Sequence, residues 1–467
     1  MTARPATIGE LRDSGWRDLT VKEELRHNVI ARLREGRSLF PGVVGFDDSV
    51  VPAMERALLA GHDIVLLGER GQAKTRIIRA LVDLLDAESP AIAGGEVNDS
   101  PYRPVSAHAR EVVAEHGDDT PIEWLPRSRR YGEKLATPDT SVADLIGDVD
   151  PIRVAEGRYL SDELVIHYGL VPRTNRGIFS INELPDLPAR IQVALFNVLE
   201  ERDVQIRGFQ VRMPIDILLV ATANPDDYTN RGRIITPLKD RFGSEVRTHY
   251  PAGAADEIHI MDQEARPPAA GVPVVVPEMM KEVLAHFSRL CRRSPQINQR
   301  AGVSVRLSIA NLETIVASAV RRAIRTGEDE AVPRVSDLSA VLQSSGGRVE
   351  LETFEEERKD EIMRQLLGHA VLEVFMARLR GHDFSDLLAA FEDGLEVTAG
   401  DLVPAPALLR PLGESPVVDA LTARLGVDPS SPGQVASAVE LALEGLHLSR
   451  RLNKTTTGVY RLAGGDQ

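Results

Sequence analysis

Residues 63–75 read DIVLLGERGQAKT, a short apolar run followed by a polar loop that ends in Lys74 and Thr75. The segment GERGQAKT at 68–75 matches the phosphate-binding loop GxxxxGK(S/T), except that Ala73 takes the place of the second glycine. In that motif a buried strand precedes the loop and a helix follows it. The apolar run before the loop and the amphipathic stretch TRIIRALVDLL after it supply both elements. This context favours a phosphate-binding loop over a lysine that merely caps a turn.

The loop predicts a specific division of labour. Backbone N–H groups of residues 69–75 and the positive end of the following helix would hold the phosphates. Lys74 would reach the β- and γ-oxygens, and Thr75 would coordinate Mg²⁺. Ala73 lies where the chain enters the helix, so we expect it to need no positive φ and its methyl group to be tolerated. The predicted cofactor-binding residues of this loop are Gly68, Glu69, Arg70, Gly71, Gln72, Ala73, Lys74 and Thr75.

Composition excludes several classes of protein. The 467 residues are 43% apolar and 27% charged, which is typical of soluble globular proteins. The formal charge of -15 lacks the basic footprint of a general nucleic-acid binder, so a nucleic-acid partner is not expected. Cys291 is the single cysteine, which excludes an internal disulfide and favours a reducing, cytoplasmic location. No signal-peptide core and no membrane-spanning run is visible, so we expect no membrane insertion.

The pattern along the chain predicts an α/β fold in which a parallel sheet is sandwiched by helices. Apolar runs at 63–67, 177–181 and 215–221 are typical of buried parallel strands, and helical periodicity lies between them. Residues 86–136 are rich in breakers and are predicted to form an excursion on one face of the sheet. The predicted domains are an N-terminal helical segment 1–35, an α/β nucleotide-binding domain 36–250, a helical lid 251–345 and a C-terminal helical extension 346–467.

Polar side chains follow two further predicted strands. Asn182 and Glu183 follow the run GIFSI, and Asn224 follows IDILLVA. A carboxylate beside the phosphate loop can orient the attacking water, which suits Glu183, while Asn182 offers Mg²⁺ an oxygen through water but no charge. The Asn224 amide can bond both the γ-phosphate and the water. Without the loop, ordinary strand exits and a turn cap before Pro225 would explain these residues equally well.

Two arginines and one hairpin complete the candidates. Arg241 in PLKDRFG and Arg306 in SVRLS offer planar, permanently charged donor groups that suit a phosphoryl transition state, although either alone is more often a surface ion pair. The segment from Val204 to Ile215 alternates around a glycine and predicts a β-hairpin. Phe209 near its tip would either contact a client protein or pack on its own domain.

The order of these motifs resembles that of the AAA+ ATPases, and within them the MoxR and magnesium-chelatase motor-subunit (ChlI/BchI-like) group. The resemblance covers residues 36–345 and rests on GERGQAKT, GIFSINELPDL, ATANPDDYTNRG, PLKDRFG and SVRLS in sequence. It implies that Asn182 and Glu183 correspond to Walker B, Asn224 to sensor 1, Arg241 to the arginine finger and Arg306 to sensor 2. It also implies that PGVVGFDD, with Val44 and Gly45, contacts adenine.

This resemblance implies an ATPase that uses ATP and Mg²⁺ and assembles into a ring, most often a hexamer, because the arginine finger completes a neighbour's site. In the MoxR group the partner is typically a protein with a von Willebrand factor A domain, and the client is remodelled. One alternative is a magnesium-chelatase motor subunit, which inserts Mg²⁺ into a porphyrin. A second is a nucleotide-gated scaffold with little hydrolysis, which Asn182 permits. A DNA motor is the least favoured.

Overall fold

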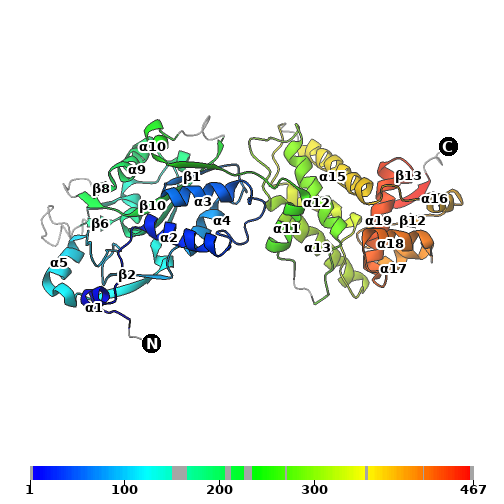
Figure 1. Cartoon of the computed structure of the whole chain (residues 1–467). Helices are drawn as coiled ribbons and strands as arrows, with labels where there is room; N and C mark the ends of the chain where they lie inside the picture. Colours follow the sequence, from blue (N-terminus) through cyan, green and yellow to red (C-terminus); the bar gives the residue numbers. More distant parts are fainter. Residues whose placement is uncertain are drawn as a thin grey trace. The chain divides into compact units, whose positions relative to one another are not determined.

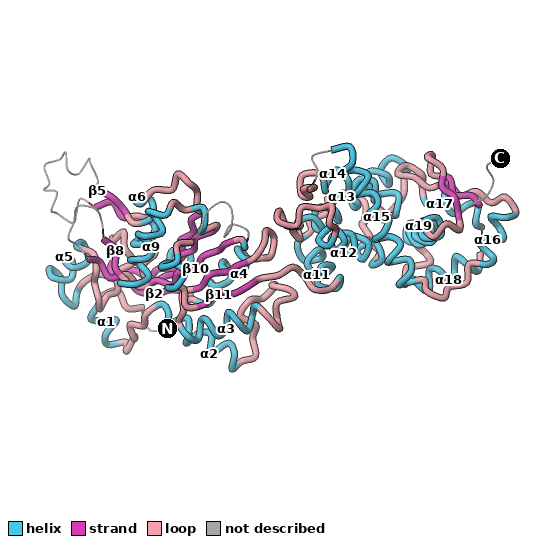
Figure 2. The backbone as a smooth tube through the Cα atoms, turned by 90° about the horizontal axis from the view of Figure 1, so that it is seen from above, coloured by secondary structure: helices cyan, strands magenta, loops and turns pink. Residues whose placement is uncertain are grey.

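The computed structural model describes residues 4–149, 166–205, 212–225, 234–268, 271–352, 356–413 and 415–462. The chain divides into two compact units, Met1–His249 and Tyr250–Gln467 (Figure 1). Strands and helices mix in the first unit, whereas the second is almost entirely helical (Figure 2). In the described part of the chain, no helix has both the length and the apolar character needed to cross a bilayer.

Parallel strands form the central sheet of the first unit in the order β11–β1–β10–β7–β4. The predicted runs at 63–67, 177–181 and 215–221 correspond to β1, β7 and β10, so the predicted α/β class is confirmed. The five strands are β1 (Ile64–Leu67), β4 (Tyr131–Leu135), β7 (Gly177–Asn182), β10 (Ile217–Ala223) and β11 (Ser244–Arg247).

Alternate residues of the strands feed two apolar cores, one on each face of the sheet. Ile64 and Leu66 of β1 point into the core built with helices α2, α3 and α4, while Val65 and Leu67 point into the core built with α9 and α10. The two sets of helices cover opposite faces (Figure 1). Burial on both sides explains why these strands read as continuous apolar runs.

The stretch 86–136 corrects one expectation. It contains an excursion, the antiparallel pair β2–β3 with α5, but it also contains β4, which is an edge strand of the central sheet. The remaining elements of the first unit are α1 (Ile8–Asp13), α2 (Val21–Arg34), α3 (Val50–Ala60), α4 (Lys74–Leu81), η1 (Val82–Leu84), β2 (Glu88–Ile92), α5 (Ala107–His116), η2 (Gly117–Asp119), β3 (Ile122–Pro126), η3 (Arg127–Arg130), α6 (Val142–Leu145), β5 (Gly147–Val149), β6 (Ile166–Tyr168), α8 (Leu170–Arg173), η5 (Leu184–Asp186), α9 (Ala189–Glu201), β8 (Asp203–Gln205), β9 (Arg212–Pro214) and α10 (Thr236–Arg241).

The predicted hairpin is present where the structure describes it. Strands β8 and β9 pair antiparallel, with Asp203 opposite Pro214 and Val204 opposite Met213. The tip with Phe209 lies outside the described residues. Its contact with a client therefore stays a prediction.

The second unit is a helical body with one small antiparallel sheet, β12–β14–β13. Residues predicted as lid and as C-terminal extension contribute to a single apolar core, in which both α12 and α19 pack against α15. Its elements are α11 (Ala254–Glu264), α12 (Glu278–Arg293), α13 (Arg306–Thr326), η7 (Val335–Ala340), α14 (Val341–Ser345), α15 (Glu356–Arg378), α16 (Ser385–Glu392), β12 (Val397–Thr398), α17 (Ala405–Leu409), η8 (Arg410–Leu412), α18 (Pro416–Leu425), α19 (Pro432–Leu448), β13 (Leu452–Lys454) and β14 (Val459–Leu462).

Candidate nucleotide-binding site

Strand register brings three of the predicted motifs to one edge of the central sheet. Leu67 at the end of β1 pairs with Ala223 of β10, and Ala221 of β10 pairs with Ile181 of β7. The backbone N–H of Gly68 continues this ladder by donating to the Ala223 carbonyl at 3.1 Å. Because all three strands run in the same direction, the residues that follow them emerge at the same carboxyl edge. These residues are the phosphate loop, Asn182 with Glu183, and Asn224.

The phosphate loop joins β1 to α4, as the motif requires. Lys74 is the first residue of the helix and is 8% exposed. Its ammonium group folds back over the loop, donating to the carbonyl of Glu69 at 2.9 Å and to that of Gly68. Thr75 follows it in the first turn and is exposed. Gly71 has φ +77°, in the left-handed region where glycine carries no steric penalty.

Ala73 overturns our expectation that it needs no positive φ. Its backbone angles are φ +54° and ψ +13°, so it caps α4 in the left-handed helical conformation. For a residue with a Cβ atom that conformation costs about 1–2 kcal/mol relative to the right-handed one. The glycine of the standard motif is therefore replaced at a position where glycine would relieve strain.

A buried pair of side chains, Gln72 and Thr248, fixes the start of the loop. We call this pair the brace, and the sequence did not reveal it. Gln72 Oε1 accepts hydrogen bonds from the Glu69 N–H at 3.0 Å and from the Thr248 hydroxyl at 2.8 Å. Thr248 directly follows β11, and its own N–H donates to the Leu67 carbonyl at 2.9 Å. A Cβ built on Gly68 would lie 1.9 Å from Thr248 Oγ1 and 2.4 Å from Gln72 Oε1. The first glycine of the motif is thus required by packing on this brace.

The segment predicted to contact adenine lies beside His249, the residue that follows Thr248. Phe46, directly after Val44 and Gly45, is buried and packs edge-on against the ring of His249, with 4.9 Å between ring centroids. The Ser49 hydroxyl lies 2.7 Å from His249 Nε2. Since His249 follows Thr248, the end of β11 links the predicted adenine segment to the phosphate loop. Whether Val44 and Gly45 contact a base stays a prediction.

Asn182 has an environment that the sequence alone could not show. Its Nδ2 donates to Glu133 Oε1 at 2.6 Å, while its Oδ1 is buried without a hydrogen-bond partner among the residues that the structure describes. Glu133 lies on the neighbouring edge strand β4, within the stretch that we had expected to leave the sheet. Carboxylate and amide oxygens are ligands that Mg²⁺ prefers. The Thr75 hydroxyl, the Asn182 Oδ1 and the Glu133 carboxylate are therefore of the oxygen types that suit this ion.

Glu183 stands in a backbone conformation that few residues of its type adopt. Its φ is +57° and its ψ +48°, and its N–H donates to the Thr222 hydroxyl on β10 at 2.9 Å. A non-glycine residue held in the left-handed region costs of order 1–3 kcal/mol and occurs preferentially at functional sites. Asn224, two residues after Thr222, is largely buried at the end of β10. The predicted roles of Glu183 and Asn224 are consistent with these positions but stay predictions.

The two predicted arginines lie on two helices, one in each unit. Arg241 ends α10, and its Nε forms an ion pair with Glu200 at 2.7 Å while its guanidinium lies 5.5 Å from the Phe196 ring centroid. The Arg241 side chain is 40% exposed. Arg306 begins α13 in the second unit, and it is exposed, with its N–H donating to Ser304 Oγ at 3.1 Å. Both therefore lie at helix ends, as their motifs predict.

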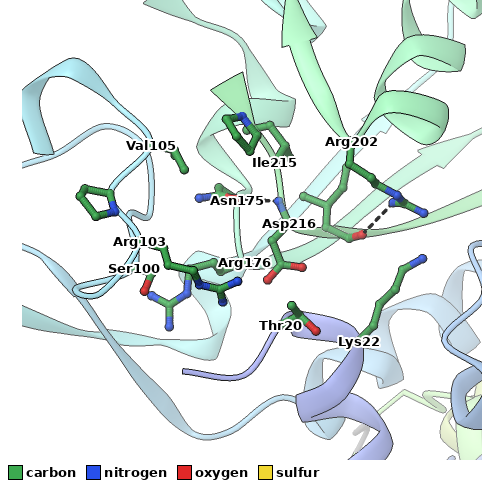
Figure 3. Close-up of a pocket in the computed structure, with 13 residues that line it drawn as sticks. Thr20, Lys22, Ser100, Arg103, Val105, Asn175, Arg176, Arg202, Ile215 and Asp216 are labelled. Atoms are coloured by element: carbon green, nitrogen blue, oxygen red, sulfur yellow. Dashed lines mark hydrogen bonds between the residues drawn. The ribbon is translucent and has the colours of Figure 1, made fainter. Parts of the chain in front are cut away.

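A cavity of about 470 Å³ in the first unit lies at the amino ends of the sheet strands, opposite the carboxyl edge. Its lining residues Arg176 and Asp216 come directly before β7 and β10, whereas the phosphate loop follows the carboxyl end of β1. Figure 3 shows the Asp216 carboxylate between Arg176 on one side and Lys22 on the other. Asp216 accepts the N–H of Val21 at 2.9 Å, and burial raises its pKa against the opposing effect of that bond. None of the predicted nucleotide-site residues lines this cavity.

Comparison with known proteins gives sequence relatives for part of the chain. A family model described as Sigma-54 interaction domain matches residues 161–238. The magnesium-chelatase subunit ChlI of Anabaena variabilis is 27% identical over 206 residues, which are 43% of this chain and 57% of that protein. The chloroplastic subunit ChlI-1 of Arabidopsis thaliana is 26% identical over 207 residues, or 44% and 46% of the two chains. The chain thus spans about half the length of the curated relatives it matches.

Among solved structures, a complex between the BchI and BchD subunits of magnesium chelatase aligns with 69% of this chain and 98% of that chain, at 22% identity and a TM-score of 0.35. At that score the likeness carries no argument, so the assignment rests on the sequence relatives, with which the observed sheet agrees. The predicted resemblance is confirmed at this level. The chain is similar in sequence to the ChlI subunits of magnesium chelatase, and in part of its first unit to the Sigma-54 interaction domain.

Proposed function

We propose that this chain binds Mg²⁺ and ATP at the carboxyl edge of its central sheet and hydrolyses the ATP to drive a partner protein. The observation that carries the proposal is the convergence, through strand register, of the phosphate loop with Asn182, Glu183 and Asn224. Motifs separated by more than a hundred residues meet only if the sheet is built in this order. Residues without a shared task would not need to converge there.

Each residue of the cluster has a chemical task in this proposal. The loop N–H groups and Lys74 bind the phosphates, and Thr75 with Asn182 holds Mg²⁺, which neutralises phosphate charge when it is bound. Glu183 orients the attacking water and accepts its proton, and Asn224 fixes that water by a hydrogen bond. Val44 and Gly45 bind the base. The strained backbone at Glu183 fits a group that must be held in one orientation.

The position of Arg241 favours assembly of the chain into a ring. Its guanidinium is partly exposed and is held at the end of α10 by Glu200 and Phe196, so it is oriented but accessible. We propose that it completes the site of a neighbouring subunit as the arginine finger, that Arg306 of the second unit is the sensor 2 arginine, and that the ring is a hexamer. The partner would be a protein with a von Willebrand factor A domain, as in the MoxR group.

A second candidate function is that of a motor subunit in a magnesium chelatase. The observation that favours it is that the curated relatives reported above are ChlI subunits of that enzyme. In that case ATP hydrolysis would drive insertion of Mg²⁺ into a porphyrin by a partner subunit. A scaffold that binds ATP and hydrolyses it slowly remains a third alternative, because Asn182 lacks the charge of an aspartate.

Lys74→Ala tests the shared core of these proposals. We expect the wild-type chain to bind a fluorescent ATP analogue and to release phosphate from ATP, and the variant to lose both by at least about tenfold, since an ammonium–phosphate contact is removed. Lys134→Ala, which removes a surface lysine beside Asp144, is the matched control. Nucleotide binding without measurable phosphate release would favour the scaffold. Equal binding by wild type and Lys74→Ala would contradict the proposed site.

A chelatase assay separates the two motor functions. The chain would be mixed with candidate partner subunits, and both ATPase stimulation and Mg²⁺ insertion into a porphyrin would be measured. Stimulation by a von Willebrand factor A protein without porphyrin metallation favours protein remodelling. Metallation that depends on Lys74 favours the chelatase.

A further inference from the structure

The metal side of the proposed site contains a carboxylate that its motif does not include. The resemblance places Asn182 where an aspartate would contribute a negative charge beside Mg²⁺. In the parallel pairing of β4 with β7, Leu135 lies opposite Asn182 and Glu133 lies opposite Ser180. Side chains two residues apart on a strand share a face, so Glu133 and Asn182 are diagonal neighbours on one face of the sheet.

The hydrogen bond between these two residues fixes which end of the amide is available. Asn182 Nδ2 donates to Glu133 Oε1 at 2.6 Å, so the amide nitrogen, which cannot bind a cation, is held against the carboxylate. The other end, Oδ1, is buried and has no hydrogen-bond partner in the described part of the chain. An orphaned buried oxygen is costly unless something else satisfies it. A cation that reaches Oδ1 would satisfy it, and the pairing leaves this end of the amide, rather than Nδ2, for the ion.

Glu133 is also connected to the helix that begins at the phosphate loop. Arg79, four residues after Thr75 and hence on the same face of α4, approaches Glu133 Oε2 at 3.2 Å, and the Tyr131 hydroxyl donates to the same oxygen at 3.0 Å. The Glu133 side chain is only 23% exposed, whereas that of Arg79 is 65% exposed. An ion pair with so exposed an arginine contributes little to stability, so the pair alone does not explain a half-buried carboxylate at this point.

We propose that Glu133 is the carboxylate of the metal side of the site. It orients the Asn182 amide so that Oδ1 faces the ion, and it supplies from the adjacent strand the negative charge that Asn182 lacks. Outer groups that orient a ligand in this way typically change metal affinity about 10–100-fold when they are removed. This inference rests on the proposed function, namely that Mg²⁺ and a nucleotide bind at this edge.

The alternative is that Glu133 only forms a salt bridge with Arg79. This alternative predicts a different result. If the pair is merely structural, Glu133→Gln and Arg79→Gln break the same contact and should have similar effects. If Glu133 serves the metal, the two substitutions act in opposite directions. Glu133→Gln removes a negative charge near the ion, while Arg79→Gln removes a competing positive charge.

The experiment measures Mg²⁺ affinity without relying on turnover. Binding of a fluorescent ADP analogue is followed in EDTA and then at increasing Mg²⁺, for wild type, Glu133→Gln, Arg79→Gln and Glu123→Gln. Glu123 pairs with Arg129 on the β2–β3 excursion and controls for loss of one surface carboxylate. We expect Glu133→Gln to raise the Mg²⁺ concentration for half-saturation about tenfold or more, Arg79→Gln to lower it, and affinity in EDTA to stay constant.

A charge-restoring variant keeps the test decisive if Glu133→Gln lowers stability. Asn182→Asp in the Glu133→Gln background returns one carboxylate to the same place and should restore the wild-type Mg²⁺ dependence. In the wild-type background Asn182→Asp sets a second carboxylate against Glu133, so it should gain far less. Identical Mg²⁺ curves for wild type and a folded Glu133→Gln chain, with nucleotide binding intact, would overturn the inference alone. Failure of the wild type to bind nucleotide under any condition would overturn the proposed function as well.

Discussion

Thr248 donates its hydroxyl hydrogen to Gln72 Oε1 at 2.8 Å and so ties the end of an edge strand to the middle of the phosphate loop. The same Gln72 oxygen accepts the N–H of Glu69 at 3.0 Å. Both side chains are buried, so this bond is shielded from water. The curvature of the loop is therefore set from outside its own sequence, by the strand that lies next to β1 in the sheet.

Thr248→Val should loosen the loop without changing the volume of the side chain. The substitution removes the donor and leaves Gln72 Oε1 with one partner fewer, which costs about 1 kcal/mol. We expect nucleotide affinity to fall about fivefold in a fluorescence titration. Thr398→Val, at an exposed strand position of the second unit, is the control. Unchanged affinity in Thr248→Val would show that the brace is dispensable.

Gly68→Ala tests the same brace by steric means. A Cβ at Gly68 would lie 1.9 Å from Thr248 Oγ1, a separation that cannot exist without a shift of the loop. We expect nucleotide binding to be nearly abolished and the chain to be destabilised by about 1–3 kcal/mol, as in overpacked cores. Thr248→Ala removes the clashing oxygen, so the double variant should recover part of both losses. No recovery would place the clash elsewhere.

Ala73→Gly should stabilise the chain, which reverses the usual effect of glycine. Relief of the left-handed strain gains about 1–2 kcal/mol, while the added freedom of the unfolded chain costs about 0.4–1 kcal/mol. We expect a net gain of up to about 1 kcal/mol in the free energy of unfolding, measured by denaturant titration. Ala80→Gly, near the end of the same helix, should instead destabilise by about 1 kcal/mol. The same sign for both would contradict the observed conformation of Ala73.

Sequence reasoning succeeded for contiguous features and failed for those that depend on strand pairing. The loop with Lys74 is a local pattern. The buried parallel strands β1, β7 and β10 are recognisable in the sequence as apolar runs. The edge strands β4 and β11 read YGEKL and SEVR and have no such run. Glu133 and Thr248 reach the site through these two strands. The left-handed φ of Ala73 is likewise a property of the folded loop, because alanine carries no side-chain signal for it.

Arg241→Ala tests the proposed ring. If Arg241 acts on a neighbour's nucleotide, the variant should bind ATP normally but hydrolyse it at least about a hundredfold more slowly. The reason is that the positive charge that stabilises the transition state is lost. Mixing it with Lys74→Ala should restore part of the activity, since some interfaces then pair an intact loop with an intact arginine. Glu200→Gln, which removes only the ion pair that holds Arg241, should have a smaller effect. Lack of complementation in mixed rings would contradict a site shared between subunits.

The burial of Cys291 predicts how the stability of the second unit depends on pH. It lies on α12 and is fully buried, and burial raises the pKa of its thiol to about 12, against the opposing charge of Arg292. In the unfolded chain the thiol ionises near pH 8.5. Since the folded pKa is the higher one, this contribution to stability is complete below about pH 8.5 and is lost as the pH rises through the window up to about 12. The free energy of unfolding should therefore fall by up to about 1.4 kcal/mol per pH unit in that window.

Comparison with Cys291→Ala isolates this slope from other groups that titrate in the same range. The variant leaves a small cavity and is less stable at neutral pH, but its stability should fall less steeply above about pH 8.5. A thiol reagent provides a second reading, because a buried neutral thiol reacts only when the helix opens. In native buffer at pH 8 we expect slow labelling, and in guanidinium chloride one rapid equivalent per chain, since the sequence has no other cysteine. Equal pH slopes for wild type and variant, or rapid native labelling, would mean that α12 does not hold this thiol out of water.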